Sequence, residues 1–285
     1  MPIDYENEYD NRSRVPEHPE IFARWAAESK TYRAASPGAQ LGLSYGSSPR
    51  QTVDLFPARS DKDAPLALFI HGGWWRSLEP SMFSQLAAGP NAHGVTVALT
   101  GYDLCPNVPI ATIIGQMRSV CLYLWRTQRK RIFVYGHSAG GHLAACMLAQ
   151  DWKANASDAP ADLVPAAYAI SGLFDLSPLL HVSQNADLRL DAEEAERVSP
   201  LHWNVPAGRR LDAVVGALES GEFLRQSRII ADGWGARGVA TRYEAVAGMN
   251  HFTVIDALGD ADSAMTKRVA EMARQAGASG NQKNA

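Results

Sequence analysis

The sequence predicts an α/β fold in which a mostly parallel central sheet carries helices on both faces. Short, continuous apolar runs recur along the chain, as strands buried on both faces require. Segments with the apolar spacing of amphipathic helices separate these runs, and strands that alternate with helices are typical of a parallel sheet. The composition is that of a globular protein, with 46% hydrophobic and 20% charged residues.

The N-terminal 36 residues are polar, with a modest helical pattern around Ile21 and Trp25. We interpret them as an arm that packs on the domain, across its active face, with a frayed terminus as the alternative. Residues 53–56 predict a more polar, antiparallel strand at the sheet edge. The predicted buried strands are residues 66–70, 95–99, 132–135, 166–170 and 213–215, and residues 241–246 alternate as a strand nearer the edge does. The predicted helices are residues 109–127, 139–149, 221–234 and 260–274.

The remaining segments complete the expected organisation. No linker divides the chain, so residues 37–275 are predicted to form a single domain. Residues 175–203 are interpreted as a small cap-like insertion over the site. Residues 276–285 are small and polar, and we expect them to be a disordered tail.

Composition excludes several classes of protein. The net charge of −3 gives no electrostatic reason to expect a nucleic acid partner. Three cysteines without C-x-x-C spacing exclude a disulfide framework. The sequence has neither a visible signal peptide nor an apolar run near the roughly 20 residues that span a bilayer. We therefore expect a soluble, cytoplasmic protein with no membrane partner, and the sequence leaves a homodimer open.

The strongest motif is G-H-S-A-G at residues 136–140, which fits the pattern G-x-S-x-G. It directly follows the predicted strand 132–135 and opens the predicted helix 139–149. A sharp turn from strand to helix needs small residues beside a strained serine. Such a turn lifts the hydroxyl above the carboxyl edge of the sheet, where ligands bind in open α/β folds. Ser138 is therefore the candidate nucleophile, with a plain tight turn as the alternative.

A second motif, H-G-G-W-W at residues 71–75, follows the predicted strand 66–70. Acyl transfer through a tetrahedral intermediate needs two or three amide donors aimed at the developing oxyanion. Adjacent glycines allow a loop whose amides face inward, so we predict an oxyanion hole from the amides of Gly73, Trp74 and Ala139. A glycine turn among buried aromatic residues is the alternative for this motif taken alone.

The general base and its acid partner are expected on loops after late strands, in the chain order serine, acid, histidine. His251 follows the last predicted strand and is the candidate base. Glu219, after the predicted strand 213–215, is the candidate acid, which would orient the imidazole. Glu222 is the alternative acid, whereas Asp212 precedes the strand and lies at the wrong end of the sheet.

Together these residues resemble the α/β-hydrolase superfamily and, within it, the kynurenine formamidase (arylformamidase) group. The resemblance covers most of the chain from about residue 40 and rests on YG at 45–46, QTVDLF at 51–56, HGGWW at 71–75, GHSAGGHLA at 136–144, ESGEFLRQS at 219–227 and HF at 251–252. It implies an α/β-hydrolase fold with a triad of Ser138, Glu219 and His251, no metal or other cofactor, and hydrolysis of N-formyl-kynurenine or related aryl formamides and esters. The eukaryotic enzymes of this group have aspartate where Glu219 stands, and glutamate can do the same work.

The sequence therefore predicts a serine hydrolase that cleaves a small-molecule amide or ester through an acyl-enzyme, with aryl formamides as the substrates. A carboxylesterase acting on small or aryl esters is the alternative within this mechanism. A non-catalytic ligand-binding protein on the same fold is the alternative outside it. Trp74, Trp75 and Trp203 are expected to line an apolar pocket for a ring, with a place in the core as the alternative.

Overall fold

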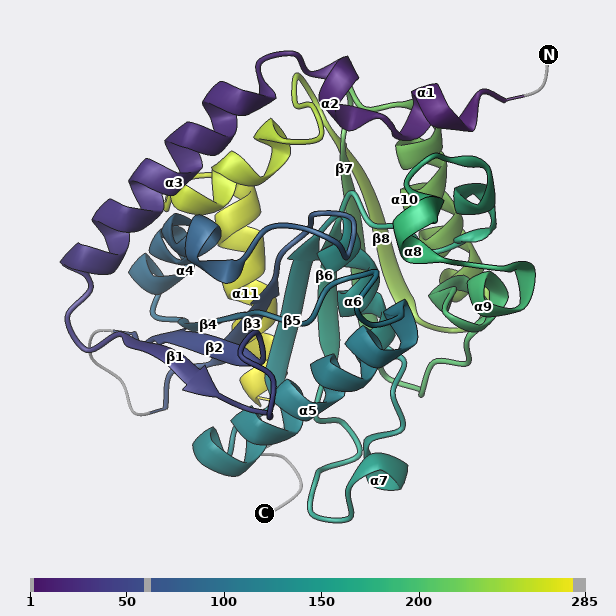
Figure 1. Cartoon of the computed structure of the whole chain (residues 1–285). Coiled ribbons are helices and arrows are strands. Elements are labelled where there is room, and N and C mark those ends of the chain that lie inside the picture. Colours follow the sequence, from purple (N-terminus) through teal and green to yellow (C-terminus); the bar gives the residue numbers. More distant parts are fainter. Residues whose placement is uncertain (1–2, 59–62, 279–285) are drawn as a thin grey trace.

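The computed structural model describes residues 3–58 and 63–278, which are built around one eight-stranded sheet (Figure 1). The strand order is β1-β2-β4-β3-β5-β6-β7-β8. β1 pairs antiparallel with β2, and β2 pairs antiparallel with β4. The other neighbours, from β4 through β8, are all parallel. The predicted mostly parallel sheet is therefore confirmed.

The bounds of the elements agree closely with the predicted pattern in the middle of the chain. The strands are β1 (Gln40–Ser44), β2 (Thr52–Phe56), β3 (Leu66–Ile70), β4 (Thr96–Thr100), β5 (Ile132–His137), β6 (Ala166–Ile170), β7 (Arg210–Gly216) and β8 (Ala240–Val246). The α-helices are α1 (Tyr5–Tyr9), α2 (Asn11–Arg14), α3 (His18–Ala35), α4 (Ala88–Ala92), α5 (Ile110–Gln128), α6 (Ala139–Leu148), α7 (Trp152–Asn155), α8 (Asn185–Leu188), α9 (Ala192–Arg197), α10 (Gly221–Gly235) and α11 (Ala264–Ala278). Short 3-10 helices are η1 (Pro80–Ala87), η2 (Ser177–His181), η3 (Pro200–His202) and η4 (Thr253–Gly259).

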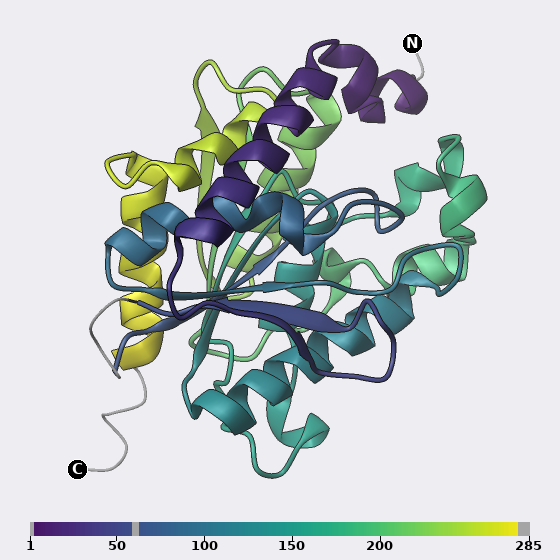
Figure 2. The same cartoon turned by 60° about the vertical axis from the view of Figure 1, so that its left-hand side comes forward.

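Alternate side chains of the central strands enter two separate apolar layers. On β3, Leu66, Leu68 and Ile70 belong to the layer that contains α5 and α6. Ala67 and Phe69 belong to the layer that contains α3, η1 and α11. Because both faces are covered, every residue of β3 is buried, which explains its uninterrupted apolar sequence. Figures 1 and 2 show the helices on the two sides of the sheet.

The helix α10 illustrates how the sequence sets local structure. The hydroxyl of Ser220, at its N-cap, accepts a hydrogen bond from the amide of Phe223 and so satisfies one of the free amides of the first turn. Phe223, Ile230 and Trp234 recur at helical spacing and are buried. The helix therefore begins at Gly221, two residues after Glu219, and its N-cap limits the loop that carries Glu219.

The predictions for the edges of the fold need correction. The antiparallel strand β2 was predicted as the edge, but β1 lies outside it. β1 is not predicted because its only apolar residues are Leu41 and Leu43, which flank Gly42, and the strand is largely exposed. The helix α11 continues to Ala278, and Ala276 is buried, so the predicted tail does not begin at residue 276. The rest of that tail, residues 279–285, lies outside the described residues.

The arm, which in the described chain is residues 3–36, forms α1, α2 and α3. Figure 1 shows α1 and α2 across one end of the sheet, with α3 running along the side of the domain. Trp25 of α3 is buried, and its indole nitrogen donates to Asp256 Oδ1 at 2.8 Å. Arg24 also bonds to Asp256. Within the described ranges, none of the helices has the length and apolar character needed to cross a membrane.

Candidate active site

Ser138 occupies the sharp turn between β5 and α6. Its backbone has φ +56° and ψ −120°, a conformation that costs a non-glycine residue about 1–3 kcal/mol. The turn is possible because the residues that flank it are glycines, which have no Cβ and so allow other backbone atoms to approach closely. A Cβ on Gly140 would lie 1.9 Å from the Ile70 carbonyl oxygen, and a Cβ on Gly136 would lie 2.3 Å from the Gly140 carbonyl oxygen. The two glycines of the motif therefore follow from sterics alone.

The loop after β3 lies directly beside this turn. A Cβ on Gly72 would lie 2.9 Å from the His137 carbonyl oxygen, so the two chains meet at backbone distance. Gly73, Trp74 and Trp75 all have positive φ, and this conformation turns the loop sharply. In the part of the chain that the structure describes, the amides of Gly73, Trp74 and Ala139 have no backbone or side-chain acceptor. The amides of the three residues predicted to form the oxyanion hole are thus free of protein acceptors among the described residues.

His71 holds the start of this loop. Its Nδ1–H donates to the Gly72 carbonyl oxygen at 2.7 Å, and its ring is stacked on those of Tyr102 and Phe83, at 4.4 and 5.8 Å between centroids. The Tyr102 hydroxyl donates to the His71 carbonyl oxygen at 2.9 Å. Burial lowers the pKa of His71 to about 4, so its imidazole is neutral at pH 7. We interpret His71 as a structural support of the loop.

His251 lies on the loop after β8 and pairs with Glu219. Its Nδ1 is 2.7 Å from Glu219 Oε2, and both side chains are almost fully buried. The other carboxylate oxygen of Glu219 accepts hydrogen bonds from Ser171 Oγ at 2.5 Å and from the Gly216 amide at 2.7 Å. Donation by Nδ1–H leaves Nε2 of His251 as the acceptor. Ser138 and His251 both line one pocket, so the three predicted residues meet at one place.

His137, next to the candidate nucleophile, connects the two sides of the site. Its Nε2–H donates to the His251 carbonyl oxygen at 2.8 Å, and the two rings are 4.7 Å apart. Burial, and then the proximity of His251, hold the pKa of His137 well below its usual range, so it donates as a neutral imidazole. Neither this contact nor the role of Ser171 is predicted from the sequence. The only available signal was that each lies at the carboxyl end of a buried strand.

The alternative acids lie in other ion pairs. Glu222, in the first turn of α10, binds Arg225 through both carboxylate oxygens at 2.8 Å and accepts from the Tyr9 hydroxyl at 2.9 Å. Asp212 pairs with Arg268 at 2.8 Å, on the strand β7 well before its carboxyl end. Neither carboxylate has a hydrogen bond to His251 among the described residues. The geometry therefore favours Glu219.

The three tryptophans expected in the pocket have different environments. Trp74 lines the pocket. Trp75 is completely buried in the core, where its ring meets that of His142 edge to face at 5.1 Å. Trp203 is half-buried after η3, and its indole nitrogen donates to the Arg197 carbonyl oxygen at 3.0 Å. The expectation for Trp75 and Trp203 is therefore corrected. The left-handed turn at Trp74 and Trp75 directs the second indole into the core.

The arm, rather than the predicted cap, forms much of the pocket wall. Tyr9, Asn11, Arg12 and Phe22 line it, whereas residues 175–203 contribute only Gln184. The wall also includes the loop after β3 and Phe252, and the enclosed volume is about 80 Å³. The predicted cap region is compact, with η2, α8, α9 and η3, and it lies beside the site.

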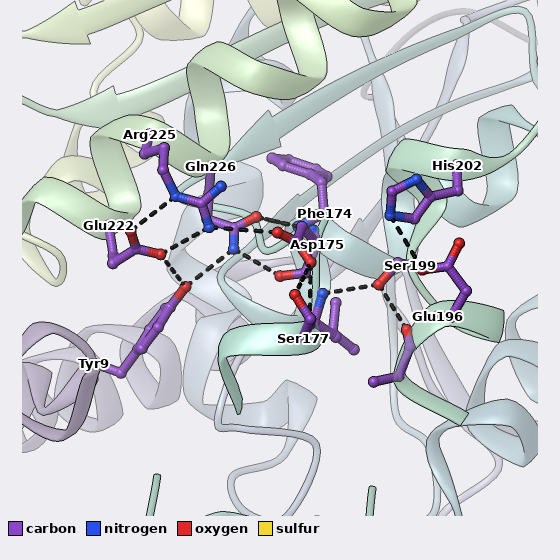
Figure 3. A network of polar contacts seen from close by, with 12 residues as sticks. Tyr9, Phe174, Asp175, Ser177, Glu196, Ser199, His202, Glu222, Arg225 and Gln226 are labelled. Carbon is purple, nitrogen blue, oxygen red and sulfur yellow. Dashed lines mark hydrogen bonds and ion pairs between the residues drawn. The ribbon is translucent and has the colours of Figure 1, made fainter. Parts of the chain in front are cut away.

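Side-chain contacts to α10 fix the arm in this position (Figure 3). The Tyr9 hydroxyl donates to Glu222 Oε2 and accepts from Gln226 Nε2 at 3.0 Å. Gln226 also accepts from the amide of Phe174 at 2.8 Å, so the same glutamine connects the arm to the start of the cap region. Glu8 accepts from the Glu222 amide at 2.8 Å. None of these long-range contacts has a local sequence signal.

Comparison with known proteins identifies the family. The model of the alpha/beta hydrolase fold family matches residues 67–255. The chain belongs to this family. A kynurenine formamidase of Salmo salar is 31% identical over 243 residues, which cover 81% of this chain and 81% of that protein. A kynurenine formamidase of Danio rerio is 29% identical over 259 residues, 87% of this chain and 86% of that protein. The resemblance inferred from the motifs is confirmed.

Solved structures agree with this assignment. A candidate thioesterase from Silicibacter sp. TM1040 has a TM-score of 0.85 and 30% identity, over 94% of this chain and 99% of that chain. A thermostable carboxylesterase cloned from a metagenomic library has a TM-score of 0.68 and 18% identity, over 91% and 97% of the two chains, and shows the fold alone. Family and relatives together identify this chain as a hydrolase of the α/β-hydrolase fold. Across the described residues, no cluster of three or more His, Cys, Asp or Glu could hold a metal ion.

Proposed function

We propose that this hydrolase cleaves N-formyl-kynurenine or related aryl formamides through an acyl-enzyme formed on Ser138. The observation that carries the proposal is the buried pair of His251 and Glu219, 2.7 Å apart, on the same pocket as a strained serine. The similarity to kynurenine formamidases over most of the chain supports the substrate class.

In the proposed mechanism, Ser138 Oγ attacks the formyl carbon while Nε2 of His251 accepts the hydroxyl proton. Glu219 holds Nδ1–H of His251, which fixes the tautomer that accepts at Nε2 and stabilises the imidazolium that forms. Ser171 and Gly216 donate to the remaining oxygen of Glu219, and these contacts hold its carboxylate in one orientation.

Negative charge then develops on the carbonyl oxygen. The free amides of Gly73, Trp74 and Ala139 are positioned to stabilise it, and Ala139 adds the positive end of α6. Loss of one such donor typically costs about 3 kcal/mol of transition-state stabilisation. The imidazolium of His251 next protonates the leaving aryl amine. Water, activated by the same histidine, releases formate and regenerates Ser138.

The size of the pocket supports a small acyl group. Its volume of about 80 Å³ is well below the roughly 300 Å³ at which pockets for drug-sized ligands begin. Arg12 and Phe22 of the arm line this same pocket, so its volume has to hold the acyl group together with the start of the leaving group, which favours formyl over a long acyl chain. The aryl leaving group then extends to the mouth of the pocket, between the arm and the loop after β3.

Ester hydrolysis is the second candidate function. It is favoured by the 30% identity to the candidate thioesterase, which extends over nearly the whole of both chains. A probable isoprenylcysteine methylesterase of Arabidopsis thaliana is also 29% identical, although only over 42% of this chain. Because esters and formamides both react through a tetrahedral intermediate that carries an oxyanion, the site described above serves both reactions.

The deciding experiment compares kcat/KM of the purified protein for N-formyl-kynurenine and for a short p-nitrophenyl ester. We expect about 10⁴ M⁻¹s⁻¹ or more on the formamide, the lower end of ordinary enzyme performance. Ester turnover without formamide cleavage would assign the protein to the esterases. If neither substrate is cleaved and a fluorophosphonate probe fails to label Ser138, the non-catalytic alternative replaces the proposal.

A further inference from the structure

The mouth of the pocket carries an arginine whose side chain forms no ion pair with a carboxylate of the described residues. Arg12, on α2 of the arm, lines the pocket and is exposed. Its guanidinium lies over the Phe22 ring at 6.0 Å, and no carboxylate of the described residues forms an ion pair with it. Arg76 lines the same pocket but pairs with Asp187 at 2.5 Å. Arg12 is therefore the cation at this mouth that remains available to a ligand.

Asn11, the neighbour of Arg12, has an unsatisfied polar group. It lines the same pocket, its side chain is buried with 5% exposure, and its Nδ2 has no acceptor among the described residues. A buried amide without a partner is costly, and proteins tolerate it mainly where a ligand or water completes the hydrogen bond. Asn11 and Arg12 thus present two donors side by side on one short helix.

The other charged group at this wall is already engaged. The carboxylate of Asp10 caps α2 and accepts hydrogen bonds from the amide and the hydroxyl of Ser13. The hydrogen bond from Ser13 and, as a smaller contribution, the charge of Arg12 hold the pKa of Asp10 below its ordinary value, but the two side chains form no ion pair within the described part of the chain. Because α1 is held to α10 through Tyr9 and Glu8, the position of α2 relative to Ser138 is fixed before a ligand arrives.

We propose that Arg12, assisted by the carboxamide of Asn11, binds a carboxylate on the leaving-group side of the substrate. This inference rests on the proposed function and adds the chemistry of the substrate's distal end. Ser138 and Arg12 line the same pocket, so a leaving group attached to an acyl carbon at Ser138 extends within this pocket towards Arg12. Guanidinium groups bind carboxylates through paired, charge-assisted hydrogen bonds. The arm therefore selects substrates, and the loops of the sheet perform the chemistry.

The test uses matched substrates in two series. One pair is formanilide and a formanilide that bears a carboxymethyl group on the ring, and the other is the corresponding pair of phenyl acetates. For each pair we expect wild-type kcat/KM to be about tenfold higher with the carboxylate, mainly through KM, because an interaction made equally in ground and transition states changes binding. Arg12→Gln should lower this ratio about tenfold, and Arg12→Lys should retain part of it.

Arg14→Gln is the matched control. Arg14 lies on the same helix and carries the same charge, but it does not line this pocket. We expect it to keep the wild-type ratio, and we expect the wild-type preference to decrease as salt increases. The inference is overturned if the wild type shows no preference for the carboxylate, or if Arg12→Gln and Arg14→Gln change the ratio equally.

Two further results separate this inference from the proposed function. If only the acetates are cleaved but the ratio still depends on Arg12, the formamide proposal fails and the carboxylate site stands. If no substrate is cleaved, the carboxylate site is tested by the rise in melting temperature that two ligands cause. These are phenylacetate, the anion of phenylacetic acid, and its uncharged amide, phenylacetamide. A larger shift with phenylacetate that is lost in Arg12→Gln supports the site, and equal shifts overturn it.

Discussion

The turn at Ser138 and the arm that lies over it are held in place by different kinds of interaction. At Ser138, backbone atoms approach so closely that a Cβ on Gly140 would lie 1.9 Å from the Ile70 carbonyl oxygen. The arm is held by side chains that reach distant partners, such as Tyr9 with Glu222, 213 positions away. The restraint on the turn at Ser138 is steric and leaves the backbone almost no conformational freedom. The restraint on the arm is a sum of hydrogen bonds, each of modest net free energy.

Because the two restraints differ in kind, we expect the two regions to respond differently to substitution. Conservative changes to the side chains of Ser138, Glu219 and His251 should abolish the reaction while the fold is retained, whereas a Cβ on Gly136 or Gly140 should destabilise the turn itself. Changes in the arm should alter stability and substrate preference while the reaction continues.

Ser138→Ala should lower kcat by about 10⁴-fold or more, since loss of a triad nucleophile in comparable hydrolases removes most of the rate enhancement. The fold should be retained, because alanine removes only the hydroxyl. Single-turnover assays together with circular dichroism would measure both. Activity within tenfold of wild type would show that another residue attacks the substrate.

Glu219→Gln should lower kcat by about 10²- to 10⁴-fold, because an amide can present the wrong partner to Nδ1–H of His251 and cannot stabilise its cation. Glu222→Gln is the matched control, since Glu222 is also buried and hydrogen-bonded but contacts Tyr9 and Arg225. We expect its kcat to stay within tenfold of wild type. Equal losses in the two variants would contradict the assignment of the acid.

Acidification from pH 7 to pH 5 should destabilise the protein. Burial lowers the pKa of His71 and of His142 to about 4, and that of His137 also lies well below its usual range. Unfolded histidines titrate near 6.5, so the unfolded chain takes up protons that the folded protein excludes. The free energy of unfolding therefore falls as pH decreases from about 6.5 towards 4, by about 2 kcal/mol at pH 5 for each of His71 and His142.

Urea denaturation at several pH values would measure this effect as a falling midpoint. Carboxyl groups titrate mainly below pH 5, so this window reports on the histidines. A free energy of unfolding that is the same at pH 7 and pH 5 would mean that these imidazoles accept protons in the folded state.

Tyr9→Phe should have the smallest effect, about 1–3 kcal/mol on the free energy of unfolding, because Glu222 and Gln226 lose a buried hydrogen-bond partner. We expect kcat/KM to fall less than tenfold. Tyr5→Phe is the control, since the Tyr5 hydroxyl has no hydrogen bond within the described residues and its ring is stacked on His181. Thermal unfolding of both variants would measure the difference. Equal melting temperatures would show that the Tyr9 contact adds no net stability.

The sequence allowed the middle of the fold to be predicted because sterics and burial act locally there. The apolar run at residues 66–70 coincides with β3, and the G-x-S-x-G motif marks the turn between β5 and α6. The pairing of His251 with Glu219 was also accessible, since parallel strands bring their carboxyl ends to the same edge of the sheet.

The parts that could not be predicted depend on long-range side-chain contacts. Nothing in the sequence near Tyr9 indicates that its hydroxyl binds Glu222, and nothing near Asn11 indicates that it lines the pocket. Trp75 was misplaced for a related reason. The sequence alone does not show which of two adjacent tryptophans lines a pocket. The backbone conformation places Trp75 in the core, where its ring contacts that of His142.

The location of the arm has a consequence for how such an enzyme can be changed. The arm contributes no strand to the sheet, although it supplies much of the pocket wall. An exposed arm residue such as Arg12 can therefore be exchanged without disturbing the strained turn at Ser138 or the pair formed by Glu219 and His251, whereas Phe22 packs on Phe252, the neighbour of His251. Grafting the first 36 residues of a related hydrolase onto this sheet is thus a direct route to enzymes that keep the reaction and differ in the molecules they accept.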